Sequence, residues 1–330
     1  MARVTVFGAG AAGTALAIHL ARKGEDVMLW GSEHDGAVLG ALIDERRHPA
    51  LPERLPHELR VLGPDGLQEA GEHAEIAVLG ANSAGAGSLG RLVAPVVEGA
   101  RLALSIAKGL EPETLERTSV VYARELPPMP VVAMSGPSLA AEIAEGLLTA
   151  VAFACEDEGA CKEAAEVFRS DRFLVDTTDD SVGVEICGMA KNVAAIGTGI
   201  LEGLSRHLQQ ENKNPRAALF TRALGEIADL CEAMGGRRDS AYGLAGVGDL
   251  LVTMLGGRNR MYGEAIGMGA EPEHTLRDME ARGLTVEGAG SAREVHELAG
   301  RQHLDLPVHE TVYRILHEGA PPTSVLEELR

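Results

Sequence analysis

Lys191 is the residue whose surroundings in the sequence most clearly suggest chemistry. It lies within residues 182–203, a stretch that is apolar nearly all round when drawn as a helix, and such helices belong inside a protein. No acidic residue stands three or four positions from Lys191 on either side, so its ammonium group needs a distant partner. A buried lysine in that position can serve as a general acid or base towards a substrate oxygen. The simpler alternative is a side chain that snorkels to the edge of its helix.

Asp249 and Arg258 add to this chemistry. Residues 244–252 are apolar except for Asp249, and a carboxylate in such a run requires a cation, so Asp249 and Lys191 can each satisfy the other. Arg258 and Asn259 follow two glycines, and a guanidinium beside a flexible backbone is suited to a phosphate or a carboxylate. The alternative for Arg258 is the solvated start of a helix.

Three glycines near the amino terminus indicate a nucleotide site. Gly8, Gly10 and Gly13 lie between a predicted strand at residues 3–7 and a predicted helix at residues 14–20, the context in which this spacing binds a dinucleotide. Gly8 permits a tight turn, Gly10 lets a pyrophosphate approach the backbone, and Gly13 allows the helix to pack closely on the strand. The positive end of the helix then faces the phosphates.

The end of the second predicted strand, residues 26–30, leaves the choice of cofactor open. An acidic residue closing that strand would bind the ribose 2′-hydroxyl of NAD, whereas an arginine just beyond it would bind the 2′-phosphate of NADP. Neither residue stands there, and the nearest acid is Glu33. The cofactor is therefore NADP or NAD, and we predict the use of both or a mild preference for NADH.

The pattern of strands and helices divides the chain in two. Strand-like runs alternate with helical ones up to residue 180, which predicts a parallel sheet with helices on both faces. The expected strands are residues 3–7, 26–30, 59–62, 76–79, 102–106, 131–134, 150–153 and 173–175, and a further helix is expected at 37–46. Residues 181–330 have the pattern of helices joined by glycine turns.

The fold class we predict is therefore α/β, with an N-terminal Rossmann-type doubly wound sheet followed by an all-α C-terminal domain. Residues 1–180 are expected to bind the dinucleotide, and residues 181–330 to hold the substrate and the catalytic groups. Residues 176–180 are the expected linker, with Ser181 as the N-cap of the Lys191 helix.

Lys108 and Ser138 follow two of the predicted strands. Ligands in sheets of this kind bind beyond the carboxyl ends of the strands, so both residues are candidates to line a site. A lysine in an exposed surface loop is the alternative for Lys108.

Composition limits the possible partners. The chain of 330 residues has a formal net charge of −19, which argues against nucleic acid or an anionic membrane as a partner. Its four cysteines show no metal-binding spacing and are expected to be packed, reduced thiols, so we expect no metal site. No run was expected to reach the ~18 apolar residues of a membrane span, and the early first strand leaves no room for a signal peptide. We expect a cytoplasmic protein without stable membrane insertion.

Seven segments, in order, resemble the NAD(P)-dependent glycerol-3-phosphate dehydrogenases. They are GAGAAGTALA at 8–17, SIAKGLE at 105–111, SGPSLAAEIAEG at 135–146, GVEICGMAKNVAAIGTGI at 183–200, LAGVGDLLVT at 244–253, GGRNRMYGEA at 256–265 and VEG at 286–288. The resemblance covers essentially the whole chain. It implies the reversible reduction of dihydroxyacetone phosphate, a phosphorylated triose, to sn-glycerol 3-phosphate for glycerophospholipid synthesis. We also expect a homodimer.

The resemblance further implies roles for individual residues. Lys191 would be the catalytic acid or base, with Asp249 and Lys108 close by. The implied substrate contacts are Lys108, Gly136, Ser138, Asn192, Asp249, Gly257, Arg258 and Asn259. The implied cofactor contacts are Gly8, Gly10, Ala11, Ala12, Gly13, Ser32, Lys108, Ala140, Arg258, Thr285 and Glu287.

Some positions depart from the family pattern. Residues 81–83 replace a usual Val-Pro turn, Leu148 replaces a usual proline, Gly257 is often serine in bacterial members, and residues 205–215 read as a longer, more polar loop. Two other functions stay open on the sequence. One is a different two-domain dehydrogenase of the 3-hydroxyacid or ketopantoate type, and the other is a non-catalytic redox sensor that binds NAD(P)H.

Overall fold

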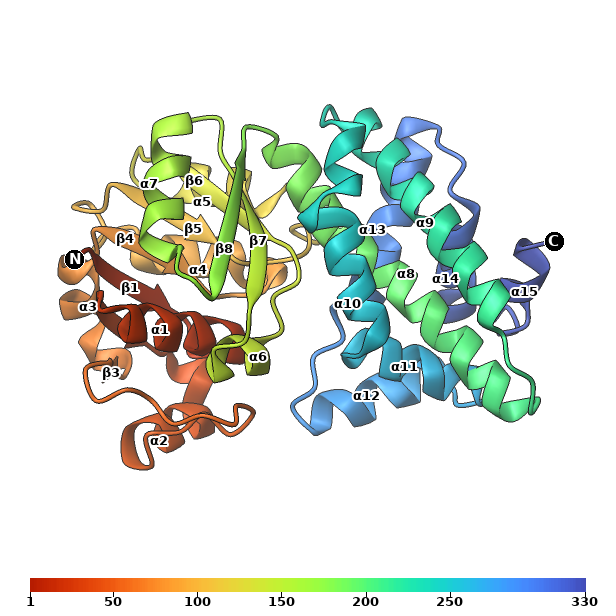
Figure 1. Ribbon diagram of the computed structural model, residues 1–330, viewed down its shortest axis with the longest axis horizontal. Helices are drawn as coiled ribbons and strands as arrows, with labels where there is room; N and C mark the ends of the chain where they lie inside the picture. The colour runs from red at the N-terminus through yellow and green to blue at the C-terminus, as the bar shows by residue number, and fades with distance from the viewer. The chain divides into compact units, whose positions relative to one another are not determined.

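The computed structural model describes all residues, Met1–Arg330, in two compact units, Met1–Ser181 and Val182–Arg330. The first unit is an eight-stranded sheet with helices on both faces, and the second is helical (Figure 1). The predicted α/β fold, with a Rossmann-type sheet followed by helices, is confirmed. The strands are β1 (Arg3–Phe7), β2 (Asp26–Trp30), β3 (Arg60–Leu62), β4 (Ile76–Leu79), β5 (Leu102–Ser105), β6 (Val131–Ser135), β7 (Thr149–Ala154) and β8 (Phe173–Thr178).

The strand order is β3-β2-β1-β4-β5-β6-β7-β8, and the first six strands are parallel. The expectation of a wholly parallel sheet is wrong at one edge, because β7 runs antiparallel to β6 and β8 is parallel to β7. The connection between β6 and β7 contains only the six-residue helix α6 (Ala140–Glu145), which ends at the left-handed Gly146. A helix that is ~9 Å long cannot carry the chain back along a whole strand, so the chain turns and pairs antiparallel.

The alternation of side chains along each strand builds a core on both faces of the sheet. In β1, Val4 and Val6 belong to one apolar cluster and Phe7 belongs to another, because successive side chains point to opposite faces. The remaining helices of this unit cover these clusters. They are α1 (Ala11–Lys23), α2 (Gly36–Asp44), α3 (Leu67–His73), α4 (Ala86–Val93), α5 (Thr118–Glu125) and α7 (Glu158–Phe168), with short 3-10 turns η1 (Glu33–Asp35), η2 (Pro64–Gly66) and η3 (Ser83–Gly85).

The second unit is organised around α8 (Ser181–His207), which is the predicted Lys191 helix. The other elements are α9 (Lys213–Ala233), η4 (Arg238–Tyr242), the π-helical turn η5 (Leu244–Gly248), α10 (Asp249–Leu255), α11 (Arg258–Gly267), α12 (Pro272–Ala281), α13 (Glu287–Gln302), α14 (Pro307–His317) and α15 (Ser324–Glu328). By length and composition α8 is apolar enough to cross a membrane, which corrects the expectation that no segment would be. Its most apolar 18-residue window is wholly buried, as in the core helix of a globular unit.

Two boundaries differ from those expected. Strand β8 extends through Thr178, so most of the predicted linker at residues 176–180 is part of the sheet. The predicted loop at residues 205–215 is mostly helical, because α8 continues to His207 and α9 begins at Lys213. Polar residues suggested a loop there, but exposed ends of helices tolerate them equally well.

Candidate active site

The turn between β1 and α1 has the geometry that the glycine spacing predicted. Gly8 has a φ of 116°, in the left-handed region that favours glycine. A Cβ on Gly13 would lie 2.8 Å from the Gly8 carbonyl oxygen, so only glycine lets the helix pack this closely on the turn. A Cβ on Gly10 would meet nothing within 4 Å, which leaves this side of the turn open to an incoming group.

The start of α1 offers donors at this open side. Gly10 is the N-cap and supplies no side-chain hydrogen bond, and Ala11, Ala12 and Gly13 form the first turn. Backbone N–H groups in the first turn of a helix have no partner within the helix and carry partial positive charge. The residues present therefore fit the pyrophosphate of a dinucleotide.

Lys108 belongs to the loop that follows β5. Its Nζ donates hydrogen bonds to the Gly136 carbonyl oxygen at 2.9 Å and to Ser138 Oγ at 3.0 Å. Ser138 Oγ in turn donates to the Gly136 carbonyl oxygen at 2.8 Å. Gly136 and Ser138 follow β6, so the structure brings these three predicted residues together at the carboxyl ends of neighbouring parallel strands. Ala140, a predicted cofactor contact, is the first residue of α6 nearby in the chain.

The loop that carries Lys108 is closed by polar contacts. Glu111 Oε2 accepts hydrogen bonds from the backbone N–H groups of Thr114 at 2.8 Å and Glu113 at 3.1 Å, and the Glu111 N–H donates to the Glu116 carbonyl oxygen at 2.9 Å. The backbone N–H of Thr114 is the main reason that the pKa of Glu111 is held below its usual value. Glu111 therefore ties the chain just after Lys108 into a compact turn.

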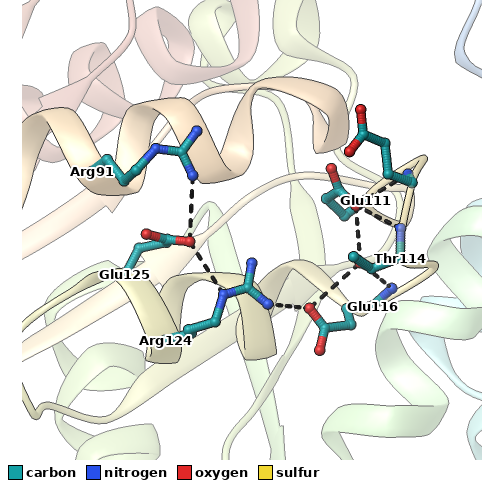
Figure 2. A network of polar contacts seen from close by, with 7 residues as sticks. Arg91, Glu111, Thr114, Glu116, Arg124 and Glu125 are labelled. Atoms are coloured by element: carbon teal, nitrogen blue, oxygen red, sulfur yellow. Dashed lines mark hydrogen bonds and ion pairs between the residues drawn. The ribbon is translucent and has the colours of Figure 1, made fainter.

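Figure 2 shows how this turn is joined to the helices beside it. Thr114 Oγ1 lies 2.9 Å from Glu111 Oε2, and Glu116 pairs with Arg124 of α5. Arg124 Nε also donates to Glu125 Oε1 at 3.2 Å. Glu125 continues the network to Arg91 of α4, 3.4 Å away. Apart from Glu125, whose side chain is 16% exposed, these side chains lie at the surface, so the network orders the loop with little burial of charge.

Lys191 is buried in the second unit and is met by residues far away in the sequence. Only 5% of Lys191 is exposed, and its Nζ donates to Asp249 Oδ1 at 3.1 Å and to Thr253 Oγ1 at 2.8 Å. The Thr253 hydroxyl donates to the Asp249 carbonyl oxygen at 2.7 Å, so its lone pair is turned towards the lysine. The predicted pairing of Lys191 with Asp249 is present. Thr253 was not predicted from the sequence, although it follows Asp249 by one helical turn.

Backbone contact between α8 and α11 sets the position of the segment that follows Asp249. A Cβ on Gly199 of α8 would lie 2.2 Å from the Arg260 carbonyl oxygen of α11. A Cβ on Gly263 of α11 would lie 2.1 Å from the Ile196 carbonyl oxygen of α8. Such distances exclude any side chain at either glycine, so the two helices touch through their backbones. The amino-terminal end of α11 is thereby held against α8, where Lys191 lies.

Asn259 completes a buried polar connection at that end. Its Nδ2 donates to Asn192 Oδ1 at 2.9 Å, and its Oδ1 accepts from the Gly288 N–H at 3.0 Å. The side chain of Asn259, predicted to contact substrate, is thus engaged within the protein, and its backbone N–H in the first turn of α11 is the group open to an anion. Gly288 follows Glu287 in the first turn of α13, so this network also places Glu287 and the preceding Thr285.

Arg258 is the first residue of α11, and its side chain is exposed. It makes no hydrogen bond or ion pair among the described residues. Its neighbour Gly257 is the N-cap, with a φ of 98°, in the left-handed region that favours glycine. An unengaged guanidinium at an uncapped helix start has the features of an anion site.

The predicted site residues therefore form clusters within each unit. The first unit holds the glycine turn and the group of Lys108, Gly136 and Ser138. The second holds Lys191 with Asp249, and the helix start that carries Arg258. Ser32 belongs to the first unit, as the N-cap of η1 after β2.

Comparison with known proteins shows to which family the chain is related. Family models described as NAD-dependent glycerol-3-phosphate dehydrogenase N-terminus and C-terminus match residues 3–161 and 180–327. An Archaeoglobus fulgidus protein named NADP(+)-dependent glycerol-3-phosphate dehydrogenase is 33% identical over 99% of this chain and 98% of its own length. The chain belongs to this dehydrogenase family.

Two further members of the glycerol-3-phosphate dehydrogenase family are similarly related. A Symbiobacterium thermophilum protein named glycerol-3-phosphate dehydrogenase [NAD(P)+] is 38% identical over 99% of this chain and 93% of its own length. The crystal structure of glycerol-3-phosphate dehydrogenase from Coxiella burnetii has a TM-score of 0.89 and 34% identity, and covers 99% of this chain and 98% of the other. The protein is accordingly an NAD(P)-dependent oxidoreductase of this family, with a small phosphorylated substrate.

Proposed function

We propose that this protein catalyses the reversible reduction of dihydroxyacetone phosphate to sn-glycerol 3-phosphate. One observation carries the proposal, namely the buried Lys191 ammonium held by Asp249 and Thr253, on a helix in backbone contact with the start of α11. A proton donor and an anion-binding helix start are thus both fixed to α8. Reduction of a phosphorylated ketone requires these two groups.

Lys191 is the acid in the direction of ketone reduction. When bound, the nicotinamide would supply the hydride to the carbonyl carbon. The carbonyl oxygen then gains negative charge, and the Lys191 ammonium stabilises that charge and donates the proton. Asp249 keeps the amine charged and Thr253 fixes its direction, because both accept hydrogen bonds from Nζ. In the reverse direction Lys191 accepts the proton of the alcohol.

The phosphate end of the substrate is assigned to the start of α11. Arg258 would grip the phosphate with its guanidinium, and the backbone N–H groups after Gly257 would add donors. Asn192 supports this end through its contact with Asn259. Binding energy gained far from the carbonyl then orients the carbonyl for the reaction.

Most of the dinucleotide contacts are assigned to the first unit, and the catalytic lysine and the phosphate contact are assigned to the second. The turn at Gly8, Gly10 and Gly13 would hold the pyrophosphate. The remaining proposed cofactor contacts are Ala11, Ala12, Ser32, Lys108, Ala140, Arg258, Thr285 and Glu287. Gly136 and Ser138 would join Lys108 at the substrate.

The cellular setting belongs to the same proposal. We place the protein in the cytoplasm as a homodimer that supplies glycerol 3-phosphate for glycerophospholipid synthesis. The buried state of α8 supports an assignment without membrane insertion, and the net charge of −19 supports one without nucleic acid.

The test compares two substrates of the native enzyme and of Arg258→Ala. We expect the native protein to oxidise NADH with dihydroxyacetone phosphate and to use phosphate-free dihydroxyacetone very poorly. Arg258→Ala should lower kcat/KM for the phosphorylated substrate. The loss should correspond to about 2–5 kcal/mol of activation free energy, because the charge of the bound phosphate would lose its partner. Arg258→Lys should also lose activity, because an ammonium cannot form the two-pronged contact of a guanidinium.

Arg258→Ala should scarcely change the residual reaction of dihydroxyacetone, because that substrate never made the contact. Equal losses with both substrates would instead leave Arg258 only its role in the fold or at the cofactor, and the assignment to the substrate phosphate would be wrong. Activity with a 3-hydroxyacid or ketopantoate in place of the triose phosphate would move the protein to another dehydrogenase class. Binding of NADH without any turnover would favour a redox sensor.

A further inference from the structure

Asp35 lies beside the position where the dinucleotide ribose meets the sheet in folds of this kind. Strand β2 ends at Trp30, and the Gly31 N–H still donates to the Leu62 carbonyl oxygen of β3 at 3.0 Å. A Cβ on Gly31 would lie 3.1 Å from Ala9 Cβ, so the end of β2 touches the glycine turn. The chain then enters η1, which ends at Asp35.

The turn folds the Asp35 carboxylate back to the end of β2. Asp35 Oδ2 accepts a hydrogen bond from the Ser32 N–H at 2.8 Å and lies 3.0 Å from Ser32 Oγ. The Ser32 hydroxyl oxygen accepts from the His34 N–H at 3.2 Å, which closes a capping box. Asp35 is half-buried, and its second oxygen, Oδ1, has no hydrogen-bond partner among the described residues. The Asp35 carboxylate is therefore held at Ser32, two residues after β2, although Asp35 itself is five residues after the strand. Its Oδ1 remains available to a ligand.

The charges around this turn oppose a phosphate. Residues 31–45 contain no lysine or arginine, His34 is their only histidine, and Glu33 is exposed in the same turn as Asp35. His48 interacts electrostatically with Asp35, but burial lowers the pKa of the His48 imidazole. The next cation, Arg46, donates to the carbonyl oxygens of Pro56 and Leu59 and is thereby directed to another loop. A 2′-phosphate carries about two negative charges near neutral pH, whereas a 2′-hydroxyl can donate to a carboxylate.

We propose that Asp35 selects NAD over NADP by accepting a hydrogen bond from the 2′-hydroxyl of the adenosine ribose. The proposal rests on the dinucleotide site assigned above to the first unit. Ser32 acts as a positioning residue, because it holds Oδ2 and leaves Oδ1 towards the ribose. Family membership by itself leaves the choice between the two cofactors open.

The test measures binding as well as turnover. Trp30 is the only tryptophan and lies at the end of β2, so its fluorescence can report NAD+ and NADP+ binding, with calorimetry as an independent check. The native protein should bind NAD+ at least about tenfold more tightly than NADP+, the scale of one hydrogen bond to a charged group. Asp35→Asn keeps the shape and an acceptor for the Ser32 N–H, but removes the charge. It should weaken NAD+ binding about tenfold, strengthen NADP+ binding, and leave the melting temperature close to native.

Glu33→Gln is the matched control, since it removes the same charge from an exposed position in the same turn. It should leave the ratio of the two dissociation constants within about threefold of native. A native preference for NADP+, or an equal change of the ratio in Asp35→Asn and Glu33→Gln, would overturn the assignment to Asp35. Failure of the proposed reaction is a separate result, because it would appear as absent turnover of dihydroxyacetone phosphate with NAD+ binding and its Asp35 dependence intact.

Discussion

The two lysines assigned to the reaction are held in different ways. Lys191 is 5% exposed and lies on a 27-residue core helix, with Asp249 and Thr253 as partners from a second helix. Lys108 is half-buried in a loop, and its partners are a carbonyl oxygen and the hydroxyl of Ser138. The first is fixed by packing, and the second by hydrogen bonds in a loop that Glu111 closes.

This difference predicts how strongly substitutions near each lysine should affect activity. A buried charge is stable only while its partners are present. Substitutions around Lys191 should therefore have large effects on activity, and salt should hardly modify these effects. The loop of Lys108 is supported by ion pairs between exposed side chains, such as that of Arg124 with Glu116, and such pairs contribute little individually. Substitutions in the loop of Lys108 should therefore have smaller effects on activity, and these effects should depend on the salt concentration.

The largest effect should follow loss of the Lys191 amine. Lys191→Ala should lower kcat by at least ~100-fold, the usual scale for removal of a general acid. Dinucleotide affinity should hardly change, because Lys191 is not one of the proposed cofactor contacts. Steady-state kinetics and NADH titration of the same preparation measure both quantities. Near-normal turnover would show that Lys191 is a structural residue.

The second-largest effect should follow disruption of the backbone contact between α8 and α11. Gly263→Ala would place a methyl group 2.1 Å from the Ile196 carbonyl oxygen and force α8 and α11 apart. We expect a loss of unfolding free energy on the order of 1–3 kcal/mol, measured by urea denaturation, together with a raised KM for dihydroxyacetone phosphate. Gly225→Ala in α9 is the control, because a Cβ there meets nothing within 4 Å. Equal stability of the two variants would show that the helices can separate freely.

A smaller effect is expected at Thr253. Thr253→Val keeps the volume but removes the hydroxyl that accepts from Lys191 Nζ. The loss of one hydrogen bond, ~1 kcal/mol, should lower kcat by about five- to tenfold. The KM for the phosphate-bearing substrate should stay close to native, since the α11 start is untouched. A change in KM alone would contradict an orienting role for Thr253.

The smallest effect should come from the loop of Lys108. Glu111→Gln weakens the contacts to the backbone N–H groups of Thr114 and Glu113, and we expect the KM for dihydroxyacetone phosphate to rise about threefold. Glu113→Gln is the control, because Glu113 contributes its backbone N–H and its side chain is exposed. If both variants and the native enzyme had equal kinetics, the turn closed by Glu111 would not be what positions Lys108.

The pH dependence of this turn follows from the direction of its pKa shift. Hydrogen bonds from the Thr114 backbone lower the pKa of Glu111 in the folded protein. The contribution of the carboxylate to stability is therefore present above the ordinary glutamate pKa of about 4.3, and is lost as pH falls through the lower folded value. The stability difference between native protein and Glu111→Gln should be measurable at pH 7 and should shrink below about pH 4. A difference that grew in acid would contradict this sign.

Much of the site could be predicted because unusual residues mark it. Lys191 is the only cation in residues 182–203, and Asp249 is the only charged residue in residues 244–252, so a cation and a carboxylate in apolar surroundings indicate one another. The glycine turn was equally clear, since Gly8 and Gly13 answer steric demands of the backbone and Gly10 leaves the turn open to a ligand. Thr253 could not be distinguished in this way, because a threonine on a helix is common and its role depends on which helix faces it.

The types of local structure and the residues that carry chemistry could therefore be predicted from local patterns along the chain. Periodicity and turn residues are local properties, so they predict strands, helices and the helical second half. The direction of β7, the burial of Asn259 in a network with Asn192, and the return of Asp35 to the end of β2 were decided only by the tertiary structure. Each depends on the distance between segments that are separate along the chain. Such distances are set by how whole elements pack, and no local pattern of residues contains them.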